Sequence, residues 1–274
     1  KGDCGDLYTV NEVPHGNVSK VWYDSPTLKM QRRMTVYTPA GYDKGKDYPV
    51  LYLLHGAGGD EDAWTTLGRA QHILDNLIAT GKAKPMVVVM TNGNPNCQAA
   101  PGEWSAGQYI PSFYGYQGAK PAATMDESFP DVMNYVENHY KVAKDKAHRA
   151  ICGLSMGGGH SFDISRRFPT KFDYIGLFSA GLHVSTTGDF RNDFYKQLQG
   201  NEEAKTQLAI LFKNKPKLYW IGMGKTDFLY KSSADLRRYF DEKGYKYTYM
   251  ETEGGHIWRN WRVYLTEFAQ KIFK

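Results

Sequence analysis

The segment from residue 149 to residue 162 has the sequence RAICGLSMGGGHSF, in which an apolar run leads directly into a serine flanked by glycines. A serine exposed on a sharp strand-to-helix turn needs small residues two positions to either side, because the strand and the helix crowd those positions. Gly153 and Gly157 meet that need around Ser155. The segment therefore predicts a buried strand, a tight turn that carries Ser155, and a helix that starts just after it.

Strand-like and helix-like patterns alternate along the rest of the chain. The predicted strands cover 7–13, 18–24, 32–39, 49–55, 85–91, 148–154, 174–180, 217–222 and 246–251. The predicted helices cover 68–82, 126–140, 156–168, one or two segments within 189–213, 233–244 and 258–273. Several of these strands are continuous apolar runs, which is typical of strands covered on both faces. The pattern predicts an α/β fold with a mostly parallel, doubly wound sheet and helices on both faces, in a single domain over residues 1–274.

The composition argues against several classes of protein. The chain has 274 residues, of which 41% are hydrophobic, and a formal net charge of +5. Its lysines and arginines are scattered and no recognition motif accompanies them, so we expect no nucleic-acid partner. No run approaches the roughly 18 apolar residues that a membrane span needs. Without an H-E-x-x-H motif or a cluster of cysteine and histidine, we expect no metal and no cofactor.

The three cysteines do not decide the compartment. Cys152 lies in a predicted strand and is expected to pack in the core. Cys4 and Cys97 lie in irregular segments and could form a disulfide bond. The first residues lack the apolar centre of a signal peptide, so any such peptide is expected to have been removed already.

Ser155 has two interpretations, as a catalytic nucleophile or as a small polar residue in an ordinary turn between strand and helix. The three glycines at 157–159 would each cost a helix about 1 kcal/mol relative to alanine, which indicates close packing at this point. The start of a helix also favours developing negative charge, and the backbone N–H of Met156 would point toward it. We therefore favour the nucleophile.

A second glycine-rich loop, HGAGGDEDAW, follows the predicted strand 49–55. It lacks the Gly-Lys-Ser/Thr ending of a phosphate-binding loop, and its acidic residues would repel phosphate. The backbone N–H of Ala57 is the natural second donor to an oxyanion formed at Ser155. His55, at the end of the strand, is expected to have a structural role.

A serine nucleophile needs a histidine base, and that histidine needs a carboxylate to fix its tautomer. His160 is only five residues after Ser155, but a helix there would direct its side chain away from the turn. His183 follows a predicted strand and is expected, at most, to line the pocket. His256 lies between the last strand and the last helix, after two glycines that let the loop reach inward. His256 is therefore the predicted base.

The predicted acid is Asp227, which follows the strand 217–222. The order along the chain is then serine, acid, histidine, as in other enzymes with a nucleophile on a strand-to-helix turn. Two rival glutamates are too close to His256 in sequence to fold back easily, and two rival aspartates look like helix-start residues. These rivals are Glu251, Glu253, Asp189 and Asp193.

The long irregular segment 92–124 is a candidate wall of a substrate site, since loops of this length are usually functional or disordered. Its aromatic side chains could stack on a sugar or a phenolic ring, or could pack the segment onto the body; they are Trp104, Tyr109, Phe113, Tyr114 and Tyr116. Trp64 follows the oxyanion loop and Trp258 follows the predicted base. Each could flank the acyl group or simply pack.

The segments HGAGGDEDAW, CGLSMGGGHS, GKTDFL and EGGHIWRNWRVYL resemble the esterase-D-like branch of the α/β-hydrolases, and carbohydrate esterase family 1 in particular. The resemblance runs from about residue 15 to the C-terminus. It implies Ser155 as nucleophile, His256 as base, Asp227 as acid, and an oxyanion hole formed by the N–H groups of Met156 and Ala57.

The same resemblance implies a substrate class, ester-decorated plant cell-wall carbohydrate, and a secreted or periplasmic protein. Release of ferulic acid from arabinoxylan-type oligosaccharides is the leading expectation, and an acetylxylan esterase is the alternative. Siderophore or acyl-thioester hydrolysis are further alternatives on the same fold. A non-catalytic carbohydrate-binding protein is the alternative from a different class.

Overall fold

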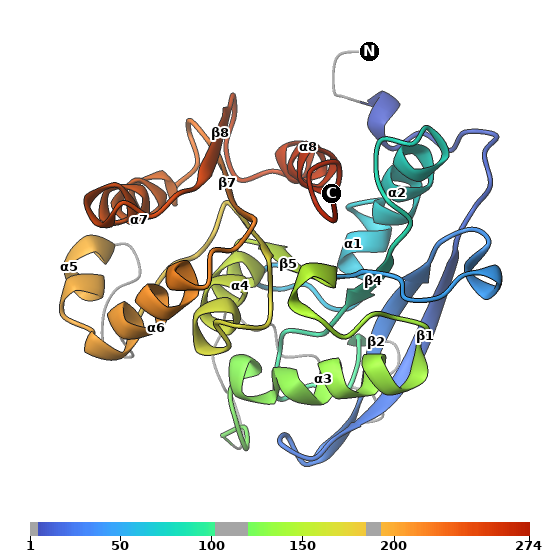
Figure 1. Cartoon of the computed structure of the whole chain (residues 1–274), viewed down its shortest axis with the longest axis horizontal. Coiled ribbons are helices and arrows are strands. Elements are labelled where there is room, and N and C mark those ends of the chain that lie inside the picture. The colour runs from blue at the N-terminus through green and yellow to red at the C-terminus, as the bar shows by residue number, and fades with distance from the viewer. Residues whose placement is uncertain (1–4, 102–119, 185–192) are drawn as a thin grey trace.

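The computed structural model describes residues 5–101, 120–184 and 193–274. These residues form one eight-stranded sheet in the order β1-β2-β4-β3-β5-β6-β7-β8 (Figure 1). The strands are β1 (Asn17–Ser25), β2 (Met30–Thr38), β3 (Val50–Leu54), β4 (Val87–Met90), β5 (Arg149–Leu154), β6 (Tyr174–Phe178), β7 (Leu218–Gly224) and β8 (Thr248–Thr252). β2 is antiparallel to β1 and β4, and the other neighbouring pairs are parallel. The predicted mostly parallel α/β fold is confirmed.

Helices cover both faces of the sheet (Figure 1). They are α1 (Ala63–Thr66), α2 (Ala70–Ala79), α3 (Met125–His139), α4 (Met156–Arg167), α5 (Phe194–Gln199), α6 (Glu202–Lys213), α7 (Tyr230–Lys243) and α8 (Trp258–Ala269). One apolar core lies between the sheet and α3 to α7, and a second lies between the sheet and α1, α2 and α8. Alternate residues of the central strands enter the two cores, as strand geometry requires. Within the described residues, no helix is long and apolar enough to cross a bilayer.

The predicted strand at 7–13 is wrong. Gly5–Leu7 forms a short 3-10 helix, and between Gly5 and Gly16 the structure describes no strand. Side chains of α2 and of the residue just before it bind the backbone carbonyls of this segment, since Arg69 Nε donates to Tyr8 O at 3.1 Å and Asn76 Nδ2 donates to Thr9 O at 2.9 Å. The segment therefore obtains its hydrogen bonds from a helix surface and has no neighbouring strand to pair with.

Most other elements differ from the prediction only at their ends. The region predicted as one or two helices within 189–213 contains two, α5 and α6, which meet at Gly200 and Asn201. The long segment predicted as a substrate wall is described only at its two ends, 92–101 and 120–124. Its candidate aromatic residues lie outside the described residues, namely Trp104, Tyr109, Phe113, Tyr114 and Tyr116.

The turn between β5 and α4 brings three backbone segments unusually close together. A Cβ at Gly157 would lie 2.5 Å from the carbonyl oxygens of Leu54 and His55, and a Cβ at Gly153 would lie 2.5 Å from Gly157. Neither position can hold a side chain without displacing main chain. The close packing expected from the glycines is therefore present, and it fixes the start of α4 against the end of β3.

Replacement of Gly157 by alanine tests this contact. We expect Gly157→Ala to lower the free energy of unfolding by at least about 1–3 kcal/mol, because the new methyl group must push backbone atoms apart. Chemical denaturation measures the effect. The matched control is Gly200→Ala, where φ is −82° and the nearest atom to a new Cβ is 3.4 Å away. Equal stability of the two variants would contradict the packing described here.

Candidate active site

Ser155, the first of the predicted site residues, has unusual backbone dihedral angles that are typical of a tight turn. Its φ is 52° and its ψ is −115°, a combination that costs a non-glycine residue about 1–3 kcal/mol. Three backbone hydrogen bonds hold it there. Ser155 N–H donates to Phe178 O at 2.9 Å, and Ser155 O accepts from Gly181 N–H at 2.8 Å and from Gly159 N–H at 3.0 Å. Strain of this kind at a partly buried serine that follows a strand is a feature of nucleophile turns.

The structure brings Ser155, His256 and Asp227 together, although they lie far apart in sequence. His256 Nε2 lies 2.9 Å from Ser155 Oγ, and His256 Nδ1 lies 2.8 Å from Asp227 Oδ2. Asp227 is buried, and its other oxygen accepts the N–H of Leu229 at 2.9 Å. Because an ionised carboxylate only accepts, Nδ1 of His256 carries the proton and Nε2 is free to accept from the serine hydroxyl.

Backbone pairing beyond the ends of β7 and β8 keeps the acid and the base adjacent. Lys225 N–H donates to Thr252 O at 2.9 Å, and Thr226 N–H donates to Gly254 O at 3.1 Å. The loop that carries the base is then capped by the buried Asn260 of α8, whose Nδ2 donates to the carbonyls of Glu253 and Gly255, each at 3.0 Å. These bonds orient the histidine before any substrate arrives.

Aromatic rings enclose His256 on two sides. Trp261 of α8 presents its ring at 86° with a centroid distance of 4.9 Å, and its indole N–H donates to Ser179 Oγ at 3.1 Å. Phe228, directly after the acid, lies 4.7 Å away at 59°. Trp261 is buried, whereas Phe228 is 63% exposed. The imidazole therefore has one neighbour in the core and one at the surface.

Trp64 and Trp258 extend the buried side of this aromatic group. Trp258 packs edge-on against Trp261 at 5.1 Å and against Trp64 at 5.2 Å. Trp64 is only 1% exposed, and its indole N–H donates to Leu54 O at 2.8 Å. The prediction that Trp64 binds substrate therefore needs correction, because the ring has no free surface to offer. Trp258 is half-buried, and its described contacts are packing contacts.

The two predicted oxyanion donors belong to segments that adjoin Ser155. Met156 is the first residue of α4, and Ala57 is exposed in the turn after β3. A Cβ at the neighbouring Gly56 would lie 3.3 Å from Ser155 Cβ, which places this turn beside the serine. Both segments therefore adjoin Ser155, and the roles of Met156 and Ala57 as oxyanion donors stay predictions.

His55 has the structural role expected for it. Its Nδ1 lies 2.7 Å from Gly56 O, and its Nε2 accepts the N–H of Gly93 at 2.8 Å. Because the carbonyl can only accept and the amide can only donate, the ring must be neutral with its proton on Nδ1. Burial lowers the pKa of His55, in agreement with this state. The ring thus ties the turn that carries Ala57 to the segment after β4.

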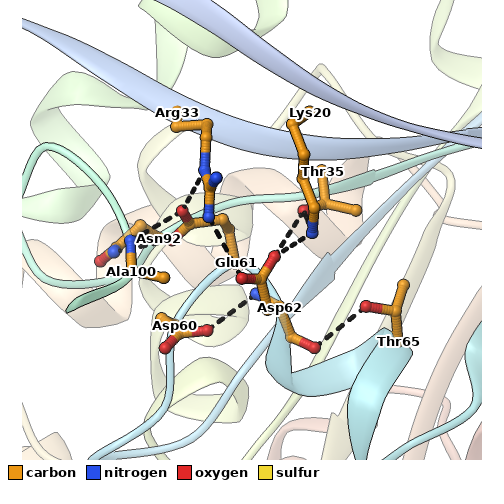
Figure 2. A network of polar contacts seen from close by, with 9 residues as sticks. All are labelled: Lys20, Arg33, Thr35, Asp60, Glu61, Asp62, Thr65, Asn92 and Ala100. Carbon is orange, nitrogen blue, oxygen red and sulfur yellow. Dashed lines mark hydrogen bonds and ion pairs between the residues drawn. The ribbon is translucent and has the colours of Figure 1, made fainter. Parts of the chain in front are cut away.

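Glu61 forms a second buried link between the same two segments (Figure 2). Its Oε1 accepts from Arg33 Nε and from the N–H of Ala100, both at 2.8 Å, and its Oε2 accepts from Asn92 Nδ2 at 3.0 Å. The Glu61 side chain is fully buried, and that of Arg33 is 6% exposed. The second carboxylate on Arg33 is Asp62, at 3.1 Å. A buried ion pair with its charges compensated therefore holds residues 92–100, the beginning of the long segment, in place.

Arg32 supports that segment from the other side. Its buried guanidinium donates to the carbonyl oxygens of Asn92, Asn94 and Cys97. Three carbonyls on one guanidinium specify the path of the chain more tightly than apolar contact would. Cys97 is a buried free thiol, as is Cys152, while Cys4 lies outside the described residues.

The histidines considered as alternative bases, His160 and His183, make no described hydrogen bond to the serine hydroxyl. His160 is on α4, and its buried Nδ1 has no hydrogen-bond partner in the described part of the chain. Burial, with a smaller effect of His55, lowers the pKa of His160 to about 4. His183 is exposed, after β6. Neither is hydrogen-bonded to Ser155, whose described side-chain partner is His256. Over the described ranges, no three His, Cys, Asp or Glu side chains gather as metal ligands.

Removal of the Glu61 charge tests the buried link. We expect Glu61→Gln to lower the free energy of unfolding by ~1–3 kcal/mol, since it replaces charged hydrogen bonds by neutral ones and leaves Asp62 as the one carboxylate described on the buried Arg33. The matched control is Glu203→Gln on the exposed surface of α6, which should change stability by less than about 0.5 kcal/mol. Urea denaturation of both variants measures this, and an equally small effect at Glu61 would contradict the assignment.

Acid should destabilise the protein through its buried histidines. The pKa of His55 and of His160 is lower in the folded chain than the usual value near 6.5. For His160, whose pKa is about 4, the unfolded chain therefore binds a proton between about pH 6.5 and 4 that the folded chain does not, and the lowered pKa of His55 acts in the same direction. The free energy of unfolding should then fall with falling pH, by at most about 1.4 kcal/mol per pH unit and per histidine.

Denaturation midpoints at pH 7, 6 and 5 measure this slope, and His160→Gln should make it shallower. Equal stability at pH 7 and pH 5 would show that these histidines are not held neutral.

The family model whose description is "Putative esterase" matches residues 25–272. The chain belongs to this esterase family. An endo-1,4-beta-xylanase/feruloyl esterase of Xylanibacter ruminicola is 33% identical over 98% of the chain, which spans 33% of that protein's length. An acetyl esterase of Caldicellulosiruptor saccharolyticus is 23% identical over 92% of the chain and 90% of its own length.

Solved structures of esterases share the fold. A carbohydrate esterase family 1 ferulic acid esterase from Anaeromyces mucronatus, in complex with ferulic acid, superposes with a TM-score of 0.73. The match covers 98% of this chain and 95% of that one, at 23% sequence identity. At this identity the likeness establishes the α/β-hydrolase fold, which the sheet order and the parallel pairing already indicated.

Proposed function

We propose that the protein is a serine carboxylic-ester hydrolase in which Ser155 is the nucleophile, His256 the general base and Asp227 the acid that orients it. The observation that carries the proposal is the unbroken hydrogen-bond chain from Ser155 Oγ through His256 to Asp227. The strained backbone of Ser155 and the family membership support it. A serine at this turn without a base would be an ordinary turn residue.

The proposed reaction has two steps. Ser155 Oγ attacks the ester carbonyl carbon while His256 Nε2 takes the hydroxyl proton, and the same nitrogen then gives that proton to the departing alcohol. Water, deprotonated by His256, next attacks the acyl carbon, and the bond to Ser155 Oγ breaks as His256 returns the proton to that oxygen, which releases the acid and the free serine. Asp227 remains ionised and stabilises the imidazolium in both steps.

The negative oxygen of each tetrahedral intermediate would be held by the N–H groups of Met156 and Ala57. Removal of one such donor typically costs about 3–4 kcal/mol of transition-state stabilisation. His55 and Glu61 contribute indirectly, because they fix the turn that carries Ala57. The proposed chemistry needs no metal and no cofactor.

The substrate we propose is a hydroxycinnamoyl ester on xylan, with ferulic acid released from arabinoxylan-type oligosaccharides. The 33% identity to a xylanase/feruloyl esterase over nearly all of this chain supports this choice. Because polymeric xylan is an extracellular material, the proposal places the protein outside the cytoplasm, secreted or periplasmic.

An acetylxylan esterase is the second candidate. It is favoured by the likeness to an acetyl esterase that this chain covers almost completely, at lower identity. The two candidates differ in the acyl group that the site must hold, a planar aromatic acid in one case and a methyl group in the other.

Substitution of the proposed catalytic residues tests the mechanism. We expect Ser155→Ala and His256→Ala each to lower kcat by at least roughly 10³-fold, by analogy with other serine triads. The control is His160→Ala, which should retain most of the activity because this ring does not contact the serine. Inactivation by His160→Ala with an active His256→Ala variant would overturn the assignment of the base.

Hydrolysis of methyl ferulate and of p-nitrophenyl acetate, with an acyl thioester and a siderophore ester alongside, distinguishes the candidate substrates. We expect turnover of methyl ferulate by the wild-type protein and none by Ser155→Ala. Turnover of acetate alone would favour the acetyl candidate. No turnover of any ester would contradict the enzyme and favour a carbohydrate-binding protein.

A further inference from the structure

The exposed aromatic ring of Phe228 packs against the imidazole of His256, the proposed base. Its ring centroid is 4.7 Å from that of His256, and 63% of the residue is exposed. Single exposed apolar side chains are ordinary on protein surfaces. This one differs because it follows Asp227 in sequence and contacts the group that would protonate the departing alcohol.

The turn that carries Phe228 is held rigidly by the acid itself. Leu229 N–H donates to Asp227 Oδ1 at 2.9 Å, and Tyr230 N–H donates to Asp227 O at 3.0 Å. Asp227 N–H in turn donates to Gly224 O at 3.1 Å. Because its backbone is already ordered, Phe228 can bind a ligand with little further loss of chain entropy.

The alcohol half of an ester must lie on this side of the site. The acyl oxygen points to the N–H groups of Met156 and Ala57, whereas the departing oxygen must come within about 3 Å of His256 Nε2 to accept its proton. Trp261 fills the buried side of His256. The group attached to the departing oxygen therefore extends toward solvent, where Phe228 lies.

We infer that Phe228 binds the sugar ring whose hydroxyl carries the ester, and so selects carbohydrate esters over simple alkyl esters. This rests on the proposed function and names the alcohol half of its substrate. A pentose or hexose presents a face of C–H groups that packs flat on an aromatic ring through dispersion and burial of apolar surface. Ile257, 44% exposed directly after His256, adds apolar surface next to the base.

The test compares two esters of one acyl group, the methyl ester and the ester with arabinose, with ferulate or acetate chosen by the assays above. In the Phe228→Ala variant we expect kcat/KM for the arabinose ester to fall roughly tenfold more than that for the methyl ester, mainly through KM. Phe228→Tyr, which keeps the ring, should restore the wild-type ratio. Ile210→Ala, at an exposed position on α6, is the control for loss of a surface side chain.

Each outcome decides between the alternatives. An equal fall for both esters would show that Phe228 only positions His256, and an unchanged ratio without any fall would show that the ring contacts no substrate. Either result overturns the sugar-binding role while the proposed ester hydrolysis stands. Absence of turnover by the wild-type protein overturns the proposed hydrolysis, and the role of Phe228 with it.

Discussion

The contact between the start of α4 and the end of β3 is the constraint on which the rest of the site depends. Gly157 lies so close to the carbonyls of Leu54 and His55 that a methyl group cannot enter. This approach sets the first turn of α4 beside the turn after β3, so that the segments of both proposed oxyanion donors adjoin Ser155. The strain in the serine backbone is tolerated because hydrogen bonds to residues at and after the end of β6, together with the packed glycines, hold the backbone in this conformation.

Two buried polar side chains, His55 and Glu61, connect the turn after β3 to the segment after β4. His55 binds one backbone group on each side, and Glu61 accepts hydrogen bonds from β2 and from two points of that segment. Buried charge is expensive, and a hydrophobic core of the same shape can be as stable. These groups contribute specificity, because their hydrogen bonds form only when the loops have this one arrangement.

The turn that carries Ser155 was predictable from the sequence around it. The residues that come from distant parts of the chain were predictable only where they follow strands of the parallel sheet. A strand pattern followed by Gly153-Leu154-Ser155-Met156-Gly157 predicts a tight turn at Ser155 without any information from the rest of the chain. Asp227 and His256 follow strands of a parallel sheet, whose carboxyl ends share one edge. Glu61 was missed because a carboxylate in an acidic, glycine-rich run looks solvated, and its partners are 28 to 39 residues away.

Phe228 and Asn260 were missed because an exposed aromatic and a buried amide give no periodic signal. The wrong strand at 7–13 has a related cause, since alternation of residues predicts a strand only if a partner strand is available. Helix side chains took the carbonyls of that segment instead.

The central claim is that the structure makes one serine reactive. A fluorophosphonate reagent, which forms a stable bond with activated serine hydroxyls, tests it directly when the modified peptide is identified by mass spectrometry. The account predicts a single adduct, on Ser155, and its loss in His256→Ala. Labelling of a different serine, or equal labelling of the two proteins, would contradict it.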